Sequence, residues 1–143
     1  MKICARVCLP LIVVSVLLRC SPAQDPNVKA ATYAAQDWLA LVDSGHYGGS
    51  WDNASALFQR KISREQWENT MGGGRSGHGS VVSRQLKSAT PDNNIPAAPG
   101  GKFVVIQFRT KFANSPTLLE TITPMQEPNG QWRVAGYFVK PLE

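Results

Sequence analysis

Residues 25–45 read DPNVKAATYAAQDWLALVDSG, and this stretch decides the fold. Asp25 offers a carboxylate to the free N–H groups of a first helical turn, and Pro26 lacks the N–H that such a turn leaves unpaired. Gly45 stands where many helices end in a left-handed residue. Between them, apolar side chains recur at helical spacing at Ala31, Ala34, Ala35, Trp38, Leu39, Leu41 and Val42. The pattern predicts an amphipathic helix that has to bury this stripe against a second layer.

Two shorter helices are predicted after it. One covers residues 50–58, and the next begins at Ser63, which has capping-box spacing to Gln66. The second of these ends in the glycines of residues 72–74. The apolar positions of the two helices are Trp51, Ala54, Leu57, Phe58, Trp67 and Met71.

The second half of the chain changes to the period of strands. Strands are predicted over residues 79–89, 102–113, 117–127 and 131–140, with a loop over 91–101. The clearest alternation places Val104, Ile106, Phe108 and Phe112 on one face, and Gln107, Arg109 and Lys111 on the other. Asn129-Gly130 is a tight hairpin signal. The chain is therefore expected to be α+β, with N-terminal helices packed on a curved four-stranded antiparallel sheet and with Trp38 and Phe108 in one core.

Two details of the last two strands are open to prediction. Pro124 is expected to end its strand early or to confine it to an edge, because proline donates no ladder hydrogen bond. Trp132, Val134 and Phe138 are predicted to share one face, and Gly136 on that face marks a bulge or a close helix approach.

The first 23 residues have the pattern of a secretory signal peptide. Lys2 and Arg6 precede the apolar run of residues 9–18, and Ser21-Pro22-Ala23 offers small residues before a cut after Ala23. The apolar run is too short for a permanent membrane span. A rival lipoprotein cut at Cys20 is disfavoured because the bulky, charged Arg19 precedes it. Residues 24–143 are then a single exported domain, periplasmic or secreted.

Cleavage after Ala23 changes the composition. All three cysteines, Cys4, Cys8 and Cys20, are lost, so the mature chain has neither a disulfide nor a thiolate nucleophile. The formal net charge falls from +5 to +2, since 12 of the 15 basic residues remain against all 10 acidic ones. A nucleic-acid partner is disfavoured at such a modest charge.

Several linked blocks of the mature chain resemble a known bacterial family, the domain of unknown function 4019. They are residues 38–47 (WLALVDSGHY), Ser50-Trp51, Trp67, Arg75, Ser83-Arg84, residues 103–108 (FVVIQF), residues 120–123 (ETIT) and residues 130–137 (GQWRVAGY). The resemblance implies a small exported protein without an assigned reaction, on a fold akin to the nuclear-transport-factor-two-like cone. It supplies no catalytic residues. Where relatives tend to have Arg-x-Pro-Leu-Gly, this chain has the looser turn Arg75-Ser76-Gly77-His78-Gly79.

One glycine-rich segment and the two histidines are considered as binding sites. The glycine-rich residues 72–79 resemble a phosphate loop, but they follow a helix, precede a strand and lack the Gly-Lys-Ser/Thr ending, so a connector is favoured. The only histidines, His46 and His78, are 32 residues apart and match no short metal motif, so surface or structural roles are favoured. We predict no metal and no cofactor.

Candidate acid/base groups are Asp43 and Tyr137. Asp43 follows an apolar run at a helix C-terminus, where the helix dipole disfavours a carboxylate, so a compensating partner such as Arg84 or Arg133 is expected. A structural ion pair is the favoured role. No nucleophile-elbow pattern supports a Ser-His-Asp site.

Candidate binding residues are the arginines Arg75, Arg84, Arg109 and Arg133. Arg109 and Lys111 point to the same side of one strand, and Arg133 joins them if the registers agree. These cations form either a site for an anionic partner or an ordinary solvated sheet face, and the solvated face is favoured. The four tryptophans, Trp38, Trp51, Trp67 and Trp132, are expected in the core rather than around a ligand.

Three functions remain open on the sequence. The leading hypothesis is a non-enzymatic exported module that binds a small ligand or a protein partner. The alternatives are a cone-fold enzyme that uses Asp43 or Tyr137, and a homodimer formed through the open sheet face that includes Val105 and Tyr137.

Overall fold

The computed structural model describes residues 24–96 and 100–142. The predicted signal peptide, the three cysteines and both predicted processing sites lie outside the described residues. Within the described part of the chain, no helix combines the length and the apolar character that a membrane span requires.

The N-terminal half is helical. Its elements are α1 (Pro26–Asp43), α2 (Tyr47–Asp52), α3 (Ala56–Lys61) and α4 (Arg64–Thr70), followed by a π-helical turn η1 (Met71–Arg75) and a 3-10 turn η2 (Ser76–His78). The predicted first helix is confirmed: the Asp25 carboxylate accepts a hydrogen bond from the N–H of Asn27 at 2.8 Å, and Gly45 has a φ of 77°.

The later helices differ from the prediction in two places. The predicted helix over residues 50–58 is two short helices, because Ser55 caps a new one by accepting from the N–H of Phe58. The predicted capping box of Ser63 and Gln66 is confirmed. The glycines at 72–74 do not end the helical path; they continue it as the π-helical turn that places Arg75.

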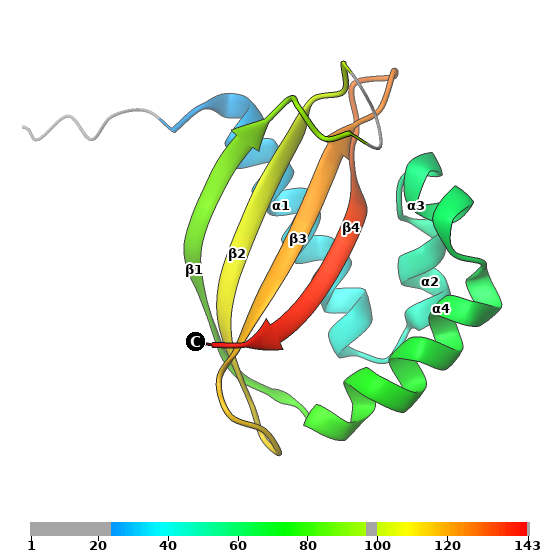
Figure 1. Cartoon of the computed structure of the whole chain (residues 1–143), viewed down its shortest axis with the longest axis vertical. Helices are drawn as coiled ribbons and strands as arrows, with labels where there is room; N and C mark the ends of the chain where they lie inside the picture. Colours follow the sequence, from blue (N-terminus) through cyan, green and yellow to red (C-terminus); the bar gives the residue numbers. More distant parts are fainter. Residues whose placement is uncertain (1–23, 97–99, 143) are drawn as a thin grey trace, which may run out of the picture.

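Four antiparallel strands form the second half, in the order β1 (Val81–Asp92), β2 (Phe103–Phe112), β3 (Leu118–Gln126) and β4 (Trp132–Pro141). Figure 1 shows the curved strands of this meander, with α1 crossing one face and α2 to α4 beside β4. The α+β class and the four-stranded antiparallel sheet are therefore confirmed. The sheet is open, with β1 and β4 at its edges, and its likeness to a closed cone stays a prediction.

One core joins α1 to the sheet. Ala31 and Ala35 are fully buried, and such small side chains let the helix backbone approach the strands closely. Trp38 and Phe108 lie in the same cluster, as predicted. Trp67 is also buried there, whereas Trp51 and Trp132 are partly buried and pack against the cluster.

A bulge in β4 changes which side chains face this core. Thr123 pairs with Gly136 but the next residue, Pro124, pairs with Val134, so one residue of β4 is unpaired. The predicted irregularity at Gly136 is confirmed. The prediction that Phe138 faces inward is wrong: it is 70% exposed, and Tyr137 packs inside instead, 5.4 Å from Trp38 between ring centroids.

Two predicted strand ends are also corrected. β3 continues through Pro124 to Gln126 in the interior of the sheet, because the proline lies at the pairing irregularity, where a missing N–H is tolerated. β1 begins at Val81 and extends to Asp92, so Pro91 belongs to the strand rather than to the predicted loop.

Candidate functional site

A cluster of polar side chains connects the helices to all four strands. It draws one residue from each of six elements: Asp43 (α1), Arg75 (η1), Arg84 (β1), Thr110 (β2), Glu120 (β3) and Tyr137 (β4). We call these six residues the polar cluster. Two carboxylates and two guanidinium groups balance its charge.

Glu120 is the centre of the polar cluster and is 0% exposed. Its carboxylate accepts hydrogen bonds from Arg84 Nε at 2.8 Å and from the Tyr137 hydroxyl at 2.8 Å, and also from the Thr110 hydroxyl. A buried carboxylate requires such partners, because an isolated charge in a protein interior is costly.

Arg84 links Glu120 to Asp43. Its Nη1 lies 2.6 Å from Asp43 Oδ2, and its Nη2 donates to Asp43 Oδ1 at 3.0 Å. Burial opposes the charge of Arg84, but the hydrogen bonds and the negative charges of Asp43 and Glu120 outweigh it, and the pKa of the guanidinium is raised. Arg84 is thus a permanent cation.

Tyr137 remains a neutral phenol in this environment. Burial, followed by the charge of Glu120 and the hydrogen bond to it, raises the pKa of the Tyr137 hydroxyl well above its ordinary value. A phenol held in this way donates to Glu120 and is a poor general base at neutral pH.

Arg75 completes the polar cluster from the glycine-rich turn. It is 7% exposed; its Nη2 lies 2.8 Å from Asp43 Oδ1, and its guanidinium lies over the Phe112 ring at 4.2 Å. Its Nη1 donates to the carbonyl of Gly79. Gly79 has a φ of 76°, and an added Cβ would lie 2.8 Å from Asn114 Nδ2, so this position suits glycine alone. The turn therefore acts as a connector that places Arg75 against Asp43.

Both predicted acid/base residues lie in the polar cluster, with one of the two arginines that were expected to partner Asp43. Arg84 links Asp43 to Glu120, and Tyr137 donates to Glu120 directly, so the expected Asp43–Arg84 pair is confirmed. Arg133 takes no part in the polar cluster. Glu120 was not singled out from the sequence, although the alternation of Leu118, Glu120 and Ile122 carries the signal: it places a carboxylate on the buried face of β3.

The two histidines have different neighbours. His46 Nδ1 lies 2.8 Å from the hydroxyl of Ser44, and the His78 ring packs 5.5 Å from that of Phe112. Within residues 24–96 and 100–142, no three His, Cys, Asp or Glu side chains are grouped closely enough to hold a metal ion.

The register separates Arg133 from Arg109. Arg109 pairs with Leu119, and Leu119 pairs with Lys140, whereas Arg133 pairs with Met125 near the hairpin. Lys140, not Arg133, is therefore the third cation beside Arg109 and Lys111. The expectation that Arg133 joins them is wrong, because Arg133 pairs with Met125, which is six residues along β3 from Leu119.

Arg133 instead lines two hollows at the hairpin end of the molecule. One has a volume of about 450 Å³ and the other about 460 Å³, and Arg133 belongs to both. We call the two together the Arg133 groove. Its walls are the α2–α3 corner, the β3–β4 hairpin and α1; besides Arg133, they include Ala30, Tyr33, Asp37, Asp52, Ala54, Gln59, Glu127, Asn129 and Trp132.

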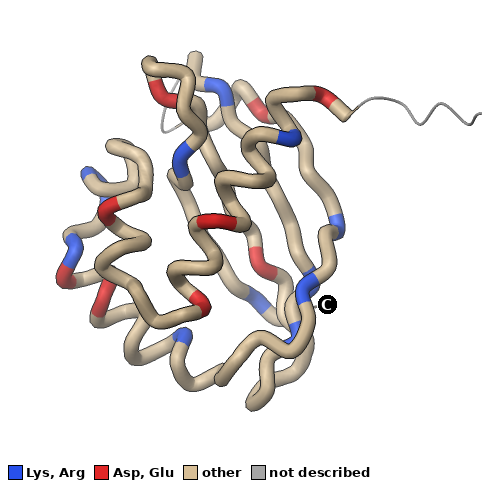
Figure 2. The backbone as a smooth tube through the Cα atoms, turned by 180° about the vertical axis from the view of Figure 1, so that it is seen from behind, with Lys and Arg blue, Asp and Glu red and all other residues tan. Residues whose placement is uncertain are grey.

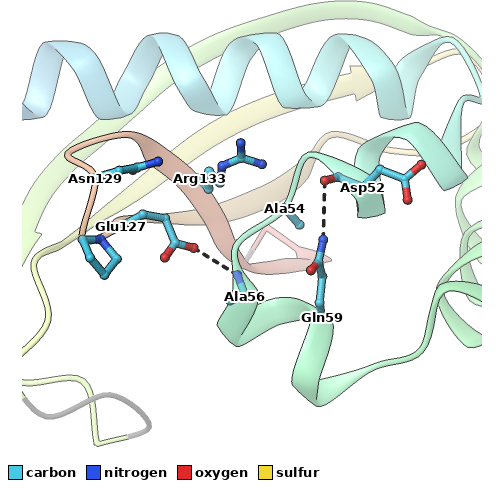
Figure 3. Close-up of a pocket in the computed structure, with 8 residues that line it drawn as sticks. Asp52, Ala54, Ala56, Gln59, Glu127, Asn129 and Arg133 are labelled. Carbon is cyan, nitrogen blue, oxygen red and sulfur yellow. Dashed lines mark hydrogen bonds between the residues drawn. The ribbon is translucent and has the colours of Figure 1, made fainter.

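Figure 3 shows the Arg133 side chain between the hairpin and Ala54, on the side toward α1. Its only side-chain hydrogen bond among the described residues runs from Nη2 to Oε1 of Gln131, at 3.2 Å. Three carboxylates also line the groove: Glu127 accepts from the N–H of Ala56 at 3.0 Å, Asp52 pairs with Arg64 at 3.3 Å, and Asp37 lies in the wall formed by α1. None of the three makes an ion pair with Arg133 among the described residues. The guanidinium is thus available to a ligand.

These observations define a class: a small α+β domain with helices packed on an open antiparallel meander, an ion-pair cluster that runs from buried Glu120 to solvent-exposed Asp43, and a polar surface groove. The chain belongs to the family described as protein of unknown function (DUF4019), whose model matches residues 34–137. The matched range includes the whole polar cluster and Arg133. No curated protein matches the chain, and no solved structure does.

Proposed function

We propose that this protein is an exported, non-enzymatic binding module whose ligand site is the Arg133 groove. One observation carries the proposal: Arg133 lines both hollows and makes its one side-chain hydrogen bond among the described residues to a neutral amide, whereas Arg75 and Arg84 form ion pairs with carboxylates. Export rests on the signal-peptide pattern of residues 1–23.

The groove favours a small polar ligand that carries an anionic group. A guanidinium presents a fixed fork of donors that matches a carboxylate or a phosphate. Gln59 and Asn129 add amide groups, and Asp37 and Glu127 add carboxylates, so hydrogen-bond donors or a cationic group on the ligand also find partners. Both hollows are shallow and open to solvent, so a ligand would lie along the surface there.

An acid/base reaction is less well supported. Asp43 and Tyr137 are bound to other residues of the polar cluster, and neither lines the Arg133 groove. A catalytic carboxyl should face the space that its substrate occupies. In the polar cluster, every carboxylate faces a protein cation instead.

The proposal is tested by titrating the exported protein with succinate, citrate, inorganic phosphate and a set of short peptides, and by following backbone amide NMR shifts. We expect saturable shifts confined to the hairpin and the α2–α3 corner with at least one of these probes. Arg133→Gln should weaken that binding at least tenfold, since it removes a hydrogen bond between charged groups.

Arg60→Gln is the matched control, because Arg60 is an exposed arginine of α3 that lies outside the groove. It should leave the affinity unchanged. The proposal is wrong if no probe binds, or if Arg133→Gln and Arg60→Gln bind equally well.

A further inference from the structure

The face of the sheet opposite α1 carries basic, apolar and neutral polar side chains in two neighbouring rows. Across β1 to β4, one row of paired residues runs Gln85, Arg109, Leu119 and Lys140. The neighbouring row runs Gln107, Thr121 and Phe138. Phe138 and Lys140 are two residues apart on β4, so their side chains leave the strand on the same side.

An apolar hollow adjoins Phe138 on this face. It has a volume of about 190 Å³ and is lined by Leu57, Lys61, Ile95, Phe103, Thr123, Ala135, Gly136 and Phe138. The β4 bulge creates it, because Gly136 has no side chain to fill the space and Ala135 is directed toward Leu57 and Phe103. Phe138 forms one wall and is 70% exposed, so the hollow has a large apolar rim in contact with solvent.

The charge of this face has one sign. Of the six basic residues of the strands, Arg84 belongs to the polar cluster and Arg133 to the Arg133 groove, while Arg109, Lys111 and Lys140 lie on this face. The two carboxylates of the strands lie elsewhere, Asp92 at the end of β1 and Glu120 inside the core. Figure 2 shows where Lys, Arg, Asp and Glu lie along the backbone. Among the described residues, Arg109, Lys111 and Lys140 make no ion pair. A face with several cations and no compensating carboxylate is complementary to an acidic partner.

We infer that this face docks an acidic protein segment that inserts one large apolar side chain into the hollow beside Phe138. The hollow is too small for most drug-sized ligands, but a cavity of about 150 Å³ accepts benzene, so one leucine or phenylalanine side chain fits. Acidic residues on either side of that anchor then reach Arg109 and Lys140. This site shares no residue with the Arg133 groove.

Two other occupants fit the face less well. A second copy that stacks the same face would bring Arg109, Lys111 and Lys140 against like charges, which costs binding energy. An anionic bilayer would satisfy the cations but would not fill a recessed hollow. Both occupants are outcomes of the experiment.

The experiment measures fluorescence anisotropy of labelled acidic peptides that have leucine, phenylalanine or alanine at a central position among aspartates and glutamates. We expect the leucine or phenylalanine peptide to bind the exported protein, and the alanine peptide to bind at least fivefold more weakly. Affinity should fall as salt is raised, since exposed charges are screened.

Phe138→Ser should weaken peptide binding at least fivefold, and the double variant Arg109→Ser/Lys140→Ser about three- to tenfold. A charge-matched control is Lys29→Ser/Arg60→Ser, in which both residues are exposed and lie on helices. It should bind as the parent does, and so should Arg133→Gln, which separates this inference from the proposed function. Circular dichroism establishes that each variant is folded, and Lys140→Glu gives a second, charge-reversed test.

Three results would overturn the inference. The first is that no acidic peptide binds, or that the control double variant loses as much affinity as Arg109→Ser/Lys140→Ser. The second is that vesicles of phosphatidylglycerol bind through the same residues while the peptides do not. The third is a dimer in sedimentation experiments that Phe138→Ser dissociates.

Discussion

At the scale of single residues, Glu120 is the side chain on which most others depend. It is a fully buried carboxylate whose contacts come from three different strands. The net value of a buried ion pair is small, because desolvation offsets the attraction, yet removal of one partner leaves the other charge unpaired. The intact polar cluster is therefore expected to add little to the free energy of unfolding, whereas the loss of one of its charged residues is expected to lower that free energy considerably.

Glu120→Gln should therefore lower the free energy of unfolding by about 3–5 kcal/mol, because it keeps the shape of the side chain but leaves Arg84 without one of its two carboxylates. Urea denaturation followed by tryptophan fluorescence measures the change. Glu65→Gln, at an exposed position in the first turn of α4, is the control and should cost no more than about 1 kcal/mol. Equal effects in the two variants would contradict the structural role of Glu120.

Tyr137 should make the free energy of unfolding depend on pH in the alkaline range. Its pKa is raised in the folded protein above the unfolded value of 10.0. Below that pH the phenol is protonated in both states, and its hydrogen bond to Glu120 contributes fully. Above it the unfolded chain loses the proton while the folded chain keeps it, so the free energy of unfolding falls as pH rises.

Tyr137→Phe should remove this part of the alkaline dependence. At neutral pH the variant should be about 1–3 kcal/mol less stable than the parent, because it lacks a hydrogen bond to a charged acceptor. The difference between the two proteins should shrink as pH rises above 10.0. Urea titrations at a series of pH values measure it; a difference that is constant across the series would show that Tyr137 ionises freely.

At the scale of elements, the distance between α1 and the sheet is set by alanines. Ala35→Leu should lower the free energy of unfolding by about 1–3 kcal/mol, because Ala35 is fully buried against the strands and added methyl groups overpack the core. Ala40→Leu, on the exposed side of the same helix, should change it by less than about 0.5 kcal/mol. Thermal denaturation of the two variants measures the difference. An Ala35→Leu variant as stable as Ala40→Leu would mean that α1 packs loosely on the sheet.

The elements themselves were predictable because each has a local cause. The period of the alanine stripe, the capping box at Ser63 and the alternation in residues 102–113 depend on neighbours within a few positions, and all three are confirmed. The β4 bulge is different. A single unpaired residue, Ala135, which precedes Gly136, exchanges the directions of Tyr137 and Phe138, and strict alternation could not predict that exchange.

At the scale of the whole molecule, the polar cluster joins the two layers that the sequence only placed side by side. Asp43 and Arg84 are 41 residues apart in sequence, and Arg84 and Glu120 are 36 apart. Such pairs depend on strand register and on the path of the glycine-rich turn. The sequence predicts a partner for Asp43, but it does not distinguish Arg84 from Arg133, because only the register decides which of them reaches α1.

The absence of cysteine after residue 23 leads to a prediction for the mature protein. The predicted cleavage after Ala23 makes Gln24 the first residue of the exported domain. Because every cysteine of the chain precedes this cut, the exported domain should contain no thiol. Its stability should then come from the core and the polar cluster alone, in an oxidising compartment where many small domains depend on disulfides. The urea midpoint should be the same with and without a reducing agent.

Mass spectrometry of the protein recovered from the periplasm or the medium measures its first residue, and paired urea titrations measure the redox dependence. The unprocessed chain is the control, because it retains Cys4, Cys8 and Cys20 and should form disulfide-linked species in oxidising buffer. A lipid-modified N-terminus at Cys20 would instead identify a membrane-anchored lipoprotein. The face of the sheet opposite α1 would then lie close to a bilayer, and the peptide and vesicle experiments would have to be repeated on the anchored protein.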